Sequence, residues 1–131
     1  MRITKLTDYA ILLLCELKQD MVLSSKQLNL KTNVPLATIN KIMRLLINSK
    51  LCSSKEGKNG GFYLLKSLSE ISMLDVISSI EGLYDGLTDC VDSQKTPCSL
   101  AGTCKITNKI KKIDNEIYAL LKNKFLNDLF S

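Results

Sequence analysis

Three cysteines lie close together in the second half of the chain, at Cys90, Cys98 and Cys104. Seven and then five residues separate them, and the intervals contain Pro97 and Gly102, which are typical of loops. Cysteine thiolates are the usual ligands of iron–sulfur clusters and are common ligands of zinc. The spacing therefore predicts a loop that holds a metal ion or an iron–sulfur cluster and needs at least one further ligand.

The composition limits what else the chain can do. Its 131 residues are enough for one domain with one core. The net charge of +5 and the pI of about 9.0 suit a polyanionic partner. The chain has no histidine, which excludes histidine ligands and histidine acid–base catalysis. No nucleophile–base pair or phosphate-binding loop is recognisable, so we expect neither an enzyme nor a small-molecule substrate.

A short apolar run near the start, residues 11–14, is predicted to be part of a helix. Charged residues flank it closely and no small-residue cleavage site follows, which argues against a signal peptide. The run is also too short to cross a bilayer. We therefore expect a cytoplasmic protein with no membrane partner. In a reducing compartment its five cysteines indicate thiols or metal ligands, and Cys15 and Cys52, in apolar stretches, are expected to pack in the core.

The first half of the chain predicts three helices. Apolar residues at three- and four-residue spacing indicate the first, from residue 4 to about residue 18, with Thr4 as its N-cap. Ser24 and Gln27 form a capping box that begins a helix over 24–32. Asn33 suits a tight turn, and Pro35 introduces a helix over 36–49. Two short helices joined by a tight turn indicate a helix-turn-helix, although a helical hairpin with a solvated charged face has the same pattern.

A β-hairpin is predicted directly after these helices. Residues 51–55 and 62–65 have strand composition, and the intervening turn is rich in glycine and includes Gly60 and Gly61. Glycines allow a tight turn and a close approach to a phosphate backbone. The pair taken alone indicates only a turn, but its position after a helix-turn-helix favours a wing.

The second half predicts two more helices around the cysteines. Ser72 and Asp75 begin a helix that stops at Gly82. The other runs from about residue 103 or 105 to residue 123. Its apolar positions alternate four- and three-residue spacings, like the seam of a coiled coil, and comprise Ile106, Ile110, Ile113, Ile117 and Leu120. This seam favours pairing between two subunits over packing within one domain. The apolar tail, residues 125–130, is expected to dock on the core.

Several segments together carry a resemblance to a known family. They are residues 1–10, the hairpin that ends in Gly-Gly-Phe-Tyr-Leu, residues 71–77, the Ile-Glu-Gly at 80–82, and the three cysteines. The chain resembles, over essentially its whole length, the iron–sulfur-cluster-dependent winged-helix regulators, IscR-like or NsrR-like. It looks most like the branch that regulates the sulfur-mobilisation pathway of cluster assembly.

The resemblance implies a mainly α fold with a small β-hairpin. Residues 1–82 would form a winged helix-turn-helix domain, residues 83–104 a cysteine loop, and residues 105–131 a dimerisation helix with its tail, together one compact unit. It also implies a homodimer that binds promoter DNA. The cluster would be held by Cys90, Cys98 and Cys104, and the sequence does not decide between [2Fe-2S] and [4Fe-4S].

The fourth cluster ligand differs between members of that family. One branch has a histidine shortly after the third cysteine, and this chain has none. In the nitric-oxide-sensing branch an aspartate of the first helix is donated by the partner subunit, and Asp8 stands at the matching position here. Asp89, Asp92, water and an exogenous thiol are the alternatives.

The polar residues of the helix-turn-helix and the wing are candidates for contacts with DNA. Asparagine suits adenine and lysine suits guanine in the major groove, so the predicted base contacts are Thr38, Asn40 and Lys41. The predicted phosphate contacts are Lys26, Arg44, Lys55 and Lys58, with Gly60 and Gly61 in the wing. Several relatives carry an arginine in the wing that enters the minor groove. Glu56 stands at that place here, which argues against minor-groove readout.

A change at the cysteine loop could alter the spacing of the two recognition helices in a dimer. That spacing must match half-sites about one turn of DNA apart. The sequence therefore predicts a regulator whose affinity for a promoter follows cluster status, and it does not decide between a repressor and an activator. The competing interpretations are a winged-helix protein with structural zinc or a thiol redox switch and, less favoured, an electron carrier that does not bind DNA.

Overall fold

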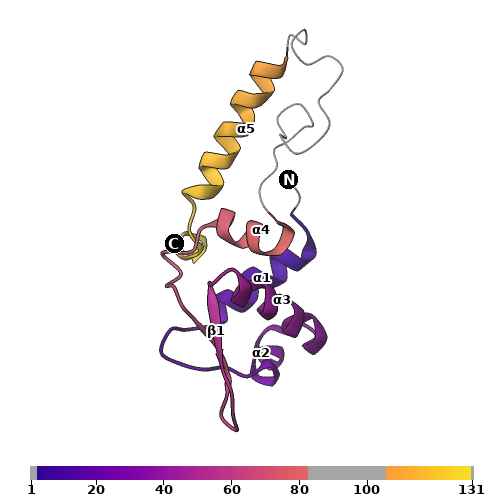
Figure 1. Cartoon of the computed structure of the whole chain (residues 1–131), viewed down its shortest axis with the longest axis vertical. Helices are drawn as coiled ribbons and strands as arrows, with labels where there is room; N and C mark the ends of the chain where they lie inside the picture. Colours follow the sequence, from indigo (N-terminus) through magenta and orange to yellow (C-terminus); the bar gives the residue numbers. More distant parts are fainter. Residues whose placement is uncertain (1–2, 83–105, 131) are drawn as a thin grey trace.

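The computed structural model describes residues 3–82 and 106–130, and its described part is mainly α-helical with one small hairpin (Figure 1). The element bounds are α1 Lys5–Glu16, α2 Ser25–Thr32, α3 Leu36–Asn48, β1 Cys52–Lys55, β2 Gly61–Leu64, α4 Met73–Glu81, α5 Thr107–Lys122 and the 3-10 helix η1 Leu126–Phe130. The predicted fold class is confirmed. Within these ranges, no helix has the length and apolarity needed to cross a membrane.

The core lies among α1, α2, α3 and α4. On α3 the apolar positions recur at three- and four-residue spacing, which turns one face of the helix inward. Ile39, Ile42, Met43 and Leu46 on that face are fully buried. The predicted inner face of α3 is thus confirmed, and the polar residues between these positions are left on the outside.

Local sequence signals place the helix ends. The Ser24 hydroxyl accepts a hydrogen bond from the backbone nitrogen of Gln27 at 3.1 Å, and the Gln27 side chain accepts one from the Ser24 nitrogen at 2.8 Å. Ser72 and Asp75 form the same reciprocal box at the start of α4. Asn33 adopts the left-handed conformation, with φ of 62°, in the turn between α2 and α3. Both capping boxes and the turn are therefore as the sequence predicts.

The hairpin is joined to the helical body by a third extended segment. β1 and β2 pair in antiparallel fashion with Cys52 opposite Leu64 and Lys55 opposite Gly61. Leu23, just before α2, exchanges two backbone hydrogen bonds with Phe62 of β2, at 2.7 and 3.0 Å. This bridge fixes the direction in which the hairpin leaves the body, beside α2.

The helix α5 extends away from the body at the end opposite the hairpin tip (Figure 1). Its C-terminal end is anchored through the tail: the Leu126 side chain is fully buried, and the Leu126 nitrogen donates to the Ile71 oxygen at 2.9 Å. The Met73 nitrogen likewise donates to the Lys124 oxygen at 2.7 Å. The tail docks on the core as predicted, although Leu129 remains about half exposed, at 52%.

Candidate functional site

The outer face of α3 carries the polar residues predicted to read base edges. Asn40, Lys41 and Arg44 are exposed, and Thr38 is half-buried. The first turn of α3 has no acidic residue and its last turn has no basic residue. The stripe lies opposite the buried apolar face and is therefore free to contact another molecule.

The start of α2 lies next to that stripe. The Ser25 hydroxyl donates a hydrogen bond of 2.7 Å to Oδ1 of Asn40. Lys26, the next residue, is exposed. The two helices of the predicted helix-turn-helix thus meet through their polar residues as well as through their apolar faces.

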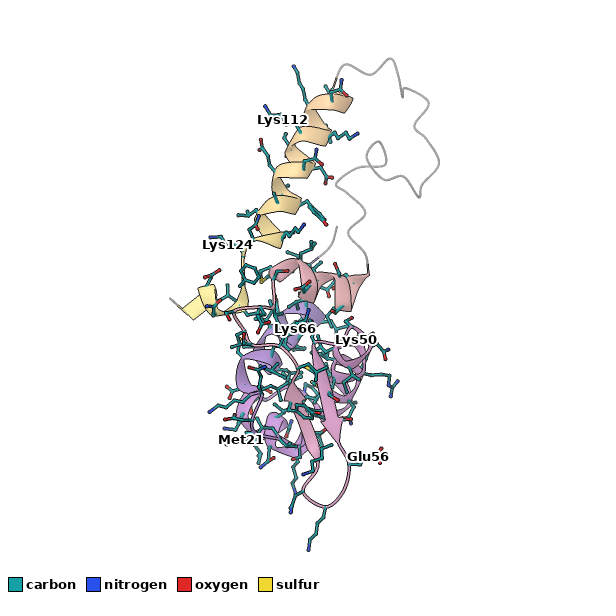
Figure 2. The ribbon with its side chains drawn as sticks, turned by 60° about the vertical axis from the view of Figure 1, so that its left-hand side comes forward. Met21, Lys50, Glu56, Lys66, Lys112 and Lys124 are labelled. Atoms are coloured by element: carbon teal, nitrogen blue, oxygen red, sulfur yellow. The ribbon has the colours of Figure 1, made fainter. Side chains whose placement is uncertain are left out.

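The wing contributes exposed charges on both sides of its turn. Lys55, Glu56 and Lys58 are all exposed, and Figure 2 shows Glu56 on the hairpin near its tip. A hollow of about 410 Å³ separates this turn from the start of α2, and it is lined by Val22, Ser24, Gln27, Lys58, Asn59 and Gly60. The wing and the helix-turn-helix therefore border one polar surface.

The two glycines of the wing have a structural role of their own. A Cβ on Gly60 would collide with the carbonyl oxygen of Lys55, and one on Gly61 would collide with the carbonyl oxygen of Leu23. Gly61 therefore permits the bridge between the hairpin and the segment before α2. This packing requirement accounts for both glycines without any contact to DNA.

Two of the five cysteines belong to the helical body and its hairpin. Cys52 is 1% exposed within the core cluster, and burial raises the pKa of its thiol to about 12. Burial, with a smaller effect of the Glu16 charge, also raises the pKa of the half-buried Cys15 thiol. Both thiols are held in the protonated form, which is a poor metal ligand. Their predicted packing role fits these positions, and neither suits the predicted cluster.

The predicted cluster ligands Cys90, Cys98 and Cys104 lie outside the described residues, as do Asp89 and Asp92. Within 3–82 and 106–130, no three cysteine, aspartate or glutamate side chains converge as a metal site. Asp8 is described: it lies exposed in the first turn of α1. The donor set of three thiolates and one carboxylate that the sequence offers is compatible with an iron–sulfur cluster.

A contact between α1 and α4 lies at the point where the cysteine segment begins. The Thr4 and Thr7 hydroxyls both donate to Oε1 of Glu81, the bond from Thr7 measuring 3.0 Å. Thr7 is fully buried, and Glu81 is the last residue of α4. These bonds hold the first turn of α1 to the end of α4, which lie close together in Figure 1. Asp8, the predicted fourth ligand, directly follows Thr7 in the sequence.

This contact corrects one prediction and adds residues that the sequence reasoning missed. Thr4 is the N-cap of α1 in position, but its side chain makes no cap hydrogen bond, because its hydroxyl donates to Glu81 instead. Thr7, Glu81 and Ser25 were not predicted as functional positions. Ser25 had a weak signal, since it follows the capping serine and its hydroxyl is not needed for the capping box.

Comparison with known proteins gives consistent results over almost the whole chain. The family described as "Rrf2: Iron-dependent Transcriptional regulator" matches residues 3–131. YffB of Lactococcus lactis, named as an HTH-type transcriptional regulator, is 32% identical over 121 residues, which cover 88% of this chain and 76% of YffB. NsrR of Oceanobacillus iheyensis, also named as an HTH-type transcriptional regulator, is 28% identical over 132 residues, covering 98% of this chain and 89% of NsrR.

A solved structure agrees with the same fold. The structure of CymR, the global cysteine regulator of B. subtilis, matches with a TM-score of 0.74 and 19% sequence identity, covering 98% of this chain and 95% of that chain. At this identity the similarity concerns the fold alone, which is the arrangement of helices and hairpin described above.

Proposed function

Because this chain belongs to the Rrf2 family of iron-dependent transcriptional regulators, we propose that it binds operator DNA as a homodimer whose affinity is controlled by an iron–sulfur cluster. The family membership confirms the resemblance inferred from the sequence. Its named relatives are transcriptional regulators and not enzymes, as the sequence predicts. The cluster, the dimer and the contacts with DNA are the proposal, which also places the protein in the cytoplasm and assigns no membrane partner or small-molecule substrate.

The proposed DNA surface is the polar stripe of α3 together with the start of α2 and the wing. The recognition helix would place Thr38, Asn40 and Lys41 against base edges in the major groove. The hollow beside Lys58 is bordered by the N-terminal end of α2, where backbone N–H groups favour an anion. A phosphate suits that place, and the predicted phosphate contacts are Lys26, Arg44, Lys55 and Lys58. Gly60 and Gly61 would act by shaping the wing.

The proposed dimer contact is the apolar face of α5. Ile106, Ile113 and Leu120 are 58%, 48% and 56% exposed, which is unusual for three large apolar side chains at seam positions. Leu12 on α1 is 50% exposed as well. A second copy packed along α5 would bury this seam and set two α3 helices at a fixed distance, as a two-fold operator requires.

The proposed cluster ligands are Cys90, Cys98, Cys104 and, from the partner subunit, Asp8. The observation that carries this assignment is the division of the five thiols, since Cys52 is 1% exposed in the core and Cys15 is half-buried on α1. Three thiolates and a carboxylate remain to bind the group. When bound, the cluster supplies iron that responds to oxygen, nitric oxide or iron supply through its weakest ligand. The absorption spectrum of the purified protein distinguishes a [2Fe-2S] from a [4Fe-4S] cluster.

The proposed coupling runs through the chain's own contacts. The cysteine segment continues directly from α4, whose last residue Glu81 accepts from Thr4 and Thr7 of α1. It also leads into α5. A change in the ligands of the three cysteines would therefore act on α4 and α5 together. The three regions 1–82, 83–104 and 105–131 would serve DNA binding, sensing and dimerisation.

The experiment that tests this proposal is anaerobic purification followed by an absorption spectrum and by iron and acid-labile sulfide analysis. The wild-type protein is expected to be coloured, and Cys98→Ala is expected to lose iron, sulfide and colour. Cys15→Ala removes a thiol of the folded body and should retain all three. A colourless protein that holds only zinc, or a pair of cysteines that oxidises to a disulfide with no metal, would contradict the proposal.

The fourth ligand and the target genes need separate measurements. Asp8→Ala is expected to leave iron bound but to speed its loss in air several-fold, because the carboxylate ligand is removed. If its rate equals that of the wild type, Asp89, Asp92 or a non-protein ligand takes this role. We assign genes of iron–sulfur cluster assembly as the regulated targets. Sequencing of genomic fragments that the cluster-loaded protein retains should recover their promoters.

A further inference from the structure

The hydrogen bond between Ser25 and Asn40 joins the first residue of α2 to the exposed face of α3. Its length of 2.7 Å is normal for a hydroxyl donor, and the two residues are 15 positions apart in the sequence. Asn40 is exposed and Ser25 is half-buried. The bond therefore fixes the side chain of a residue that points away from the protein.

The Ser25 hydroxyl is not required for the start of α2. Ser24 provides the cap, with its hydroxyl accepting from the Gln27 nitrogen and the Gln27 side chain accepting from the Ser24 nitrogen. Adjacent serines thus have different partners. Ser24 stabilises its own helix, whereas Ser25 contacts the other helix of the pair.

The direction of this bond determines what Asn40 presents to its surroundings. A hydroxyl donor at Oδ1 uses one of the two lone pairs of the amide oxygen. The second lone pair and both hydrogens of the amide nitrogen stay available. Adenine offers an acceptor at N7 and a donor at N6 in the major groove, and this amide can satisfy both. An exposed asparagine without the bond would have to lose side-chain freedom when it contacts a base.

We propose that Ser25 is a positioning residue that holds the Asn40 amide in the orientation for reading adenine in the major groove. This inference rests on the proposed function, because it requires α3 to enter that groove. It predicts that Ser25 affects base preference at one base pair and not the general affinity for DNA. Lys26 and Arg44, the proposed phosphate contacts whose charges attract any duplex, do not depend on it.

The test begins with duplexes that the wild-type protein selects from a randomised pool, with binding measured by fluorescence anisotropy. Asn40→Ala identifies the A·T pair at which base preference is lost. At that pair, Ser25→Ala is expected to lower the preference for adenine by about threefold to tenfold, a part of what a good bidentate contact contributes. Ser25→Ala combined with Asn40→Ala should show no more loss than Asn40→Ala alone.

Two further variants separate positioning from folding. Ser25→Thr keeps a hydroxyl and should retain the preference for adenine. Ser24→Ala removes the cap and should lower the melting temperature while weakening binding to all duplexes alike. The positioning role is refuted if Ser25→Ala keeps the adenine preference, or if it weakens every duplex equally as Ser24→Ala does. A wild-type protein that selects no duplex and shows no salt-dependent binding would instead refute the proposed function itself.

Discussion

The two ends of the molecule differ in how far their side chains find partners within the same chain. At the hairpin end, a capping box begins α2, a backbone bridge at Leu23 joins the segment before α2 to the wing, and the bond from Ser25 to Asn40 joins α2 to α3. At the other end, α5 extends from the body (Figure 1). Large apolar side chains along it, such as Ile113 and Leu120, are about half exposed. In Figure 2, Lys112 is labelled on α5 and Lys124 just after the helix ends. In the proposed function, the first region binds DNA and the second packs against the same helix of a second copy.

The difference indicates a division of labour between the ends. A recognition surface must already have its shape before it meets DNA, because ordering it on binding would lower the affinity. A dimer contact can stay incomplete in one chain, because the second copy supplies the missing partner. The contact of Glu81 with Thr4 and Thr7 lies between the two regions and is the place where one could influence the other.

The largest expected effect comes from a charge placed in the exposed apolar face of α5. Ile113→Asp places a carboxylate in the exposed apolar seam and should turn the dimer into a monomer, because a buried unpaired charge is strongly unfavourable. Loss of the second recognition helix should lower the affinity for a two-fold operator by about 100-fold or more. Light scattering and anisotropy measure the two effects. Asn115→Asp, on the outer side of α5, should change neither, and a dimeric Ile113→Asp would refute this role of α5.

On the surface formed by α2, α3 and the wing, removal of a single positive charge should have a moderate effect on the affinity for DNA. Arg44→Ala is expected to weaken binding about tenfold for all sequences alike and to reduce the salt dependence by about one counterion, because one phosphate contact is lost. Titrations over a series of salt concentrations measure both quantities. The oligomeric state should not change. If Arg44→Ala instead relaxes base preference at one position, Arg44 reads a base and not a phosphate.

The contact between α1 and α4 can be weakened by a substitution that keeps the shape of the side chain. Thr7→Val removes the 3.0 Å hydrogen bond to Glu81 at a fully buried position and is expected to lower the free energy of unfolding by about 1 kcal/mol. Urea denaturation measures this change. We also expect Thr7→Val to shrink the difference in operator affinity between cluster-loaded and cluster-free protein. Thr7→Ser loses a buried methyl group and should cost a similar amount of stability, but it keeps the hydrogen bond and should keep the difference in affinity. An undiminished difference would show that coupling bypasses this contact.

The smallest expected effect concerns the wing. Glu56→Lys replaces a carboxylate near the hairpin tip with a cation and should raise the affinity for DNA about threefold at low salt, with the gain lost at high salt. Glu70→Lys makes the same change of charge between β2 and α4 and serves as the matched control. Equal gains from both variants would mean that the wing does not approach the duplex.

Much of the fold follows from residues that are close together in the sequence. The capping boxes at Ser24 and Ser72 join residues three positions apart, and α3 is defined by the spacing of its buried residues. The likeness to the family rests on such local segments too. The hairpin was predicted from its composition, with strand bounds that differ from the observed ones by one residue at each of three ends. Short-range signals of this kind depend only on helix and strand geometry.

What the sequence determined by itself is the order of the elements, the polar stripe of α3 and the gathering of three cysteines away from the other two. The tertiary structure decided the partners of particular side chains. Thr4 donates to Glu81, 77 positions away, and not to its own helix, and Gly61 is required because Leu23 approaches its backbone. Such contacts arise when distant segments pack together. No periodicity or capping pattern specifies them, because each depends on where the whole chain places its partner.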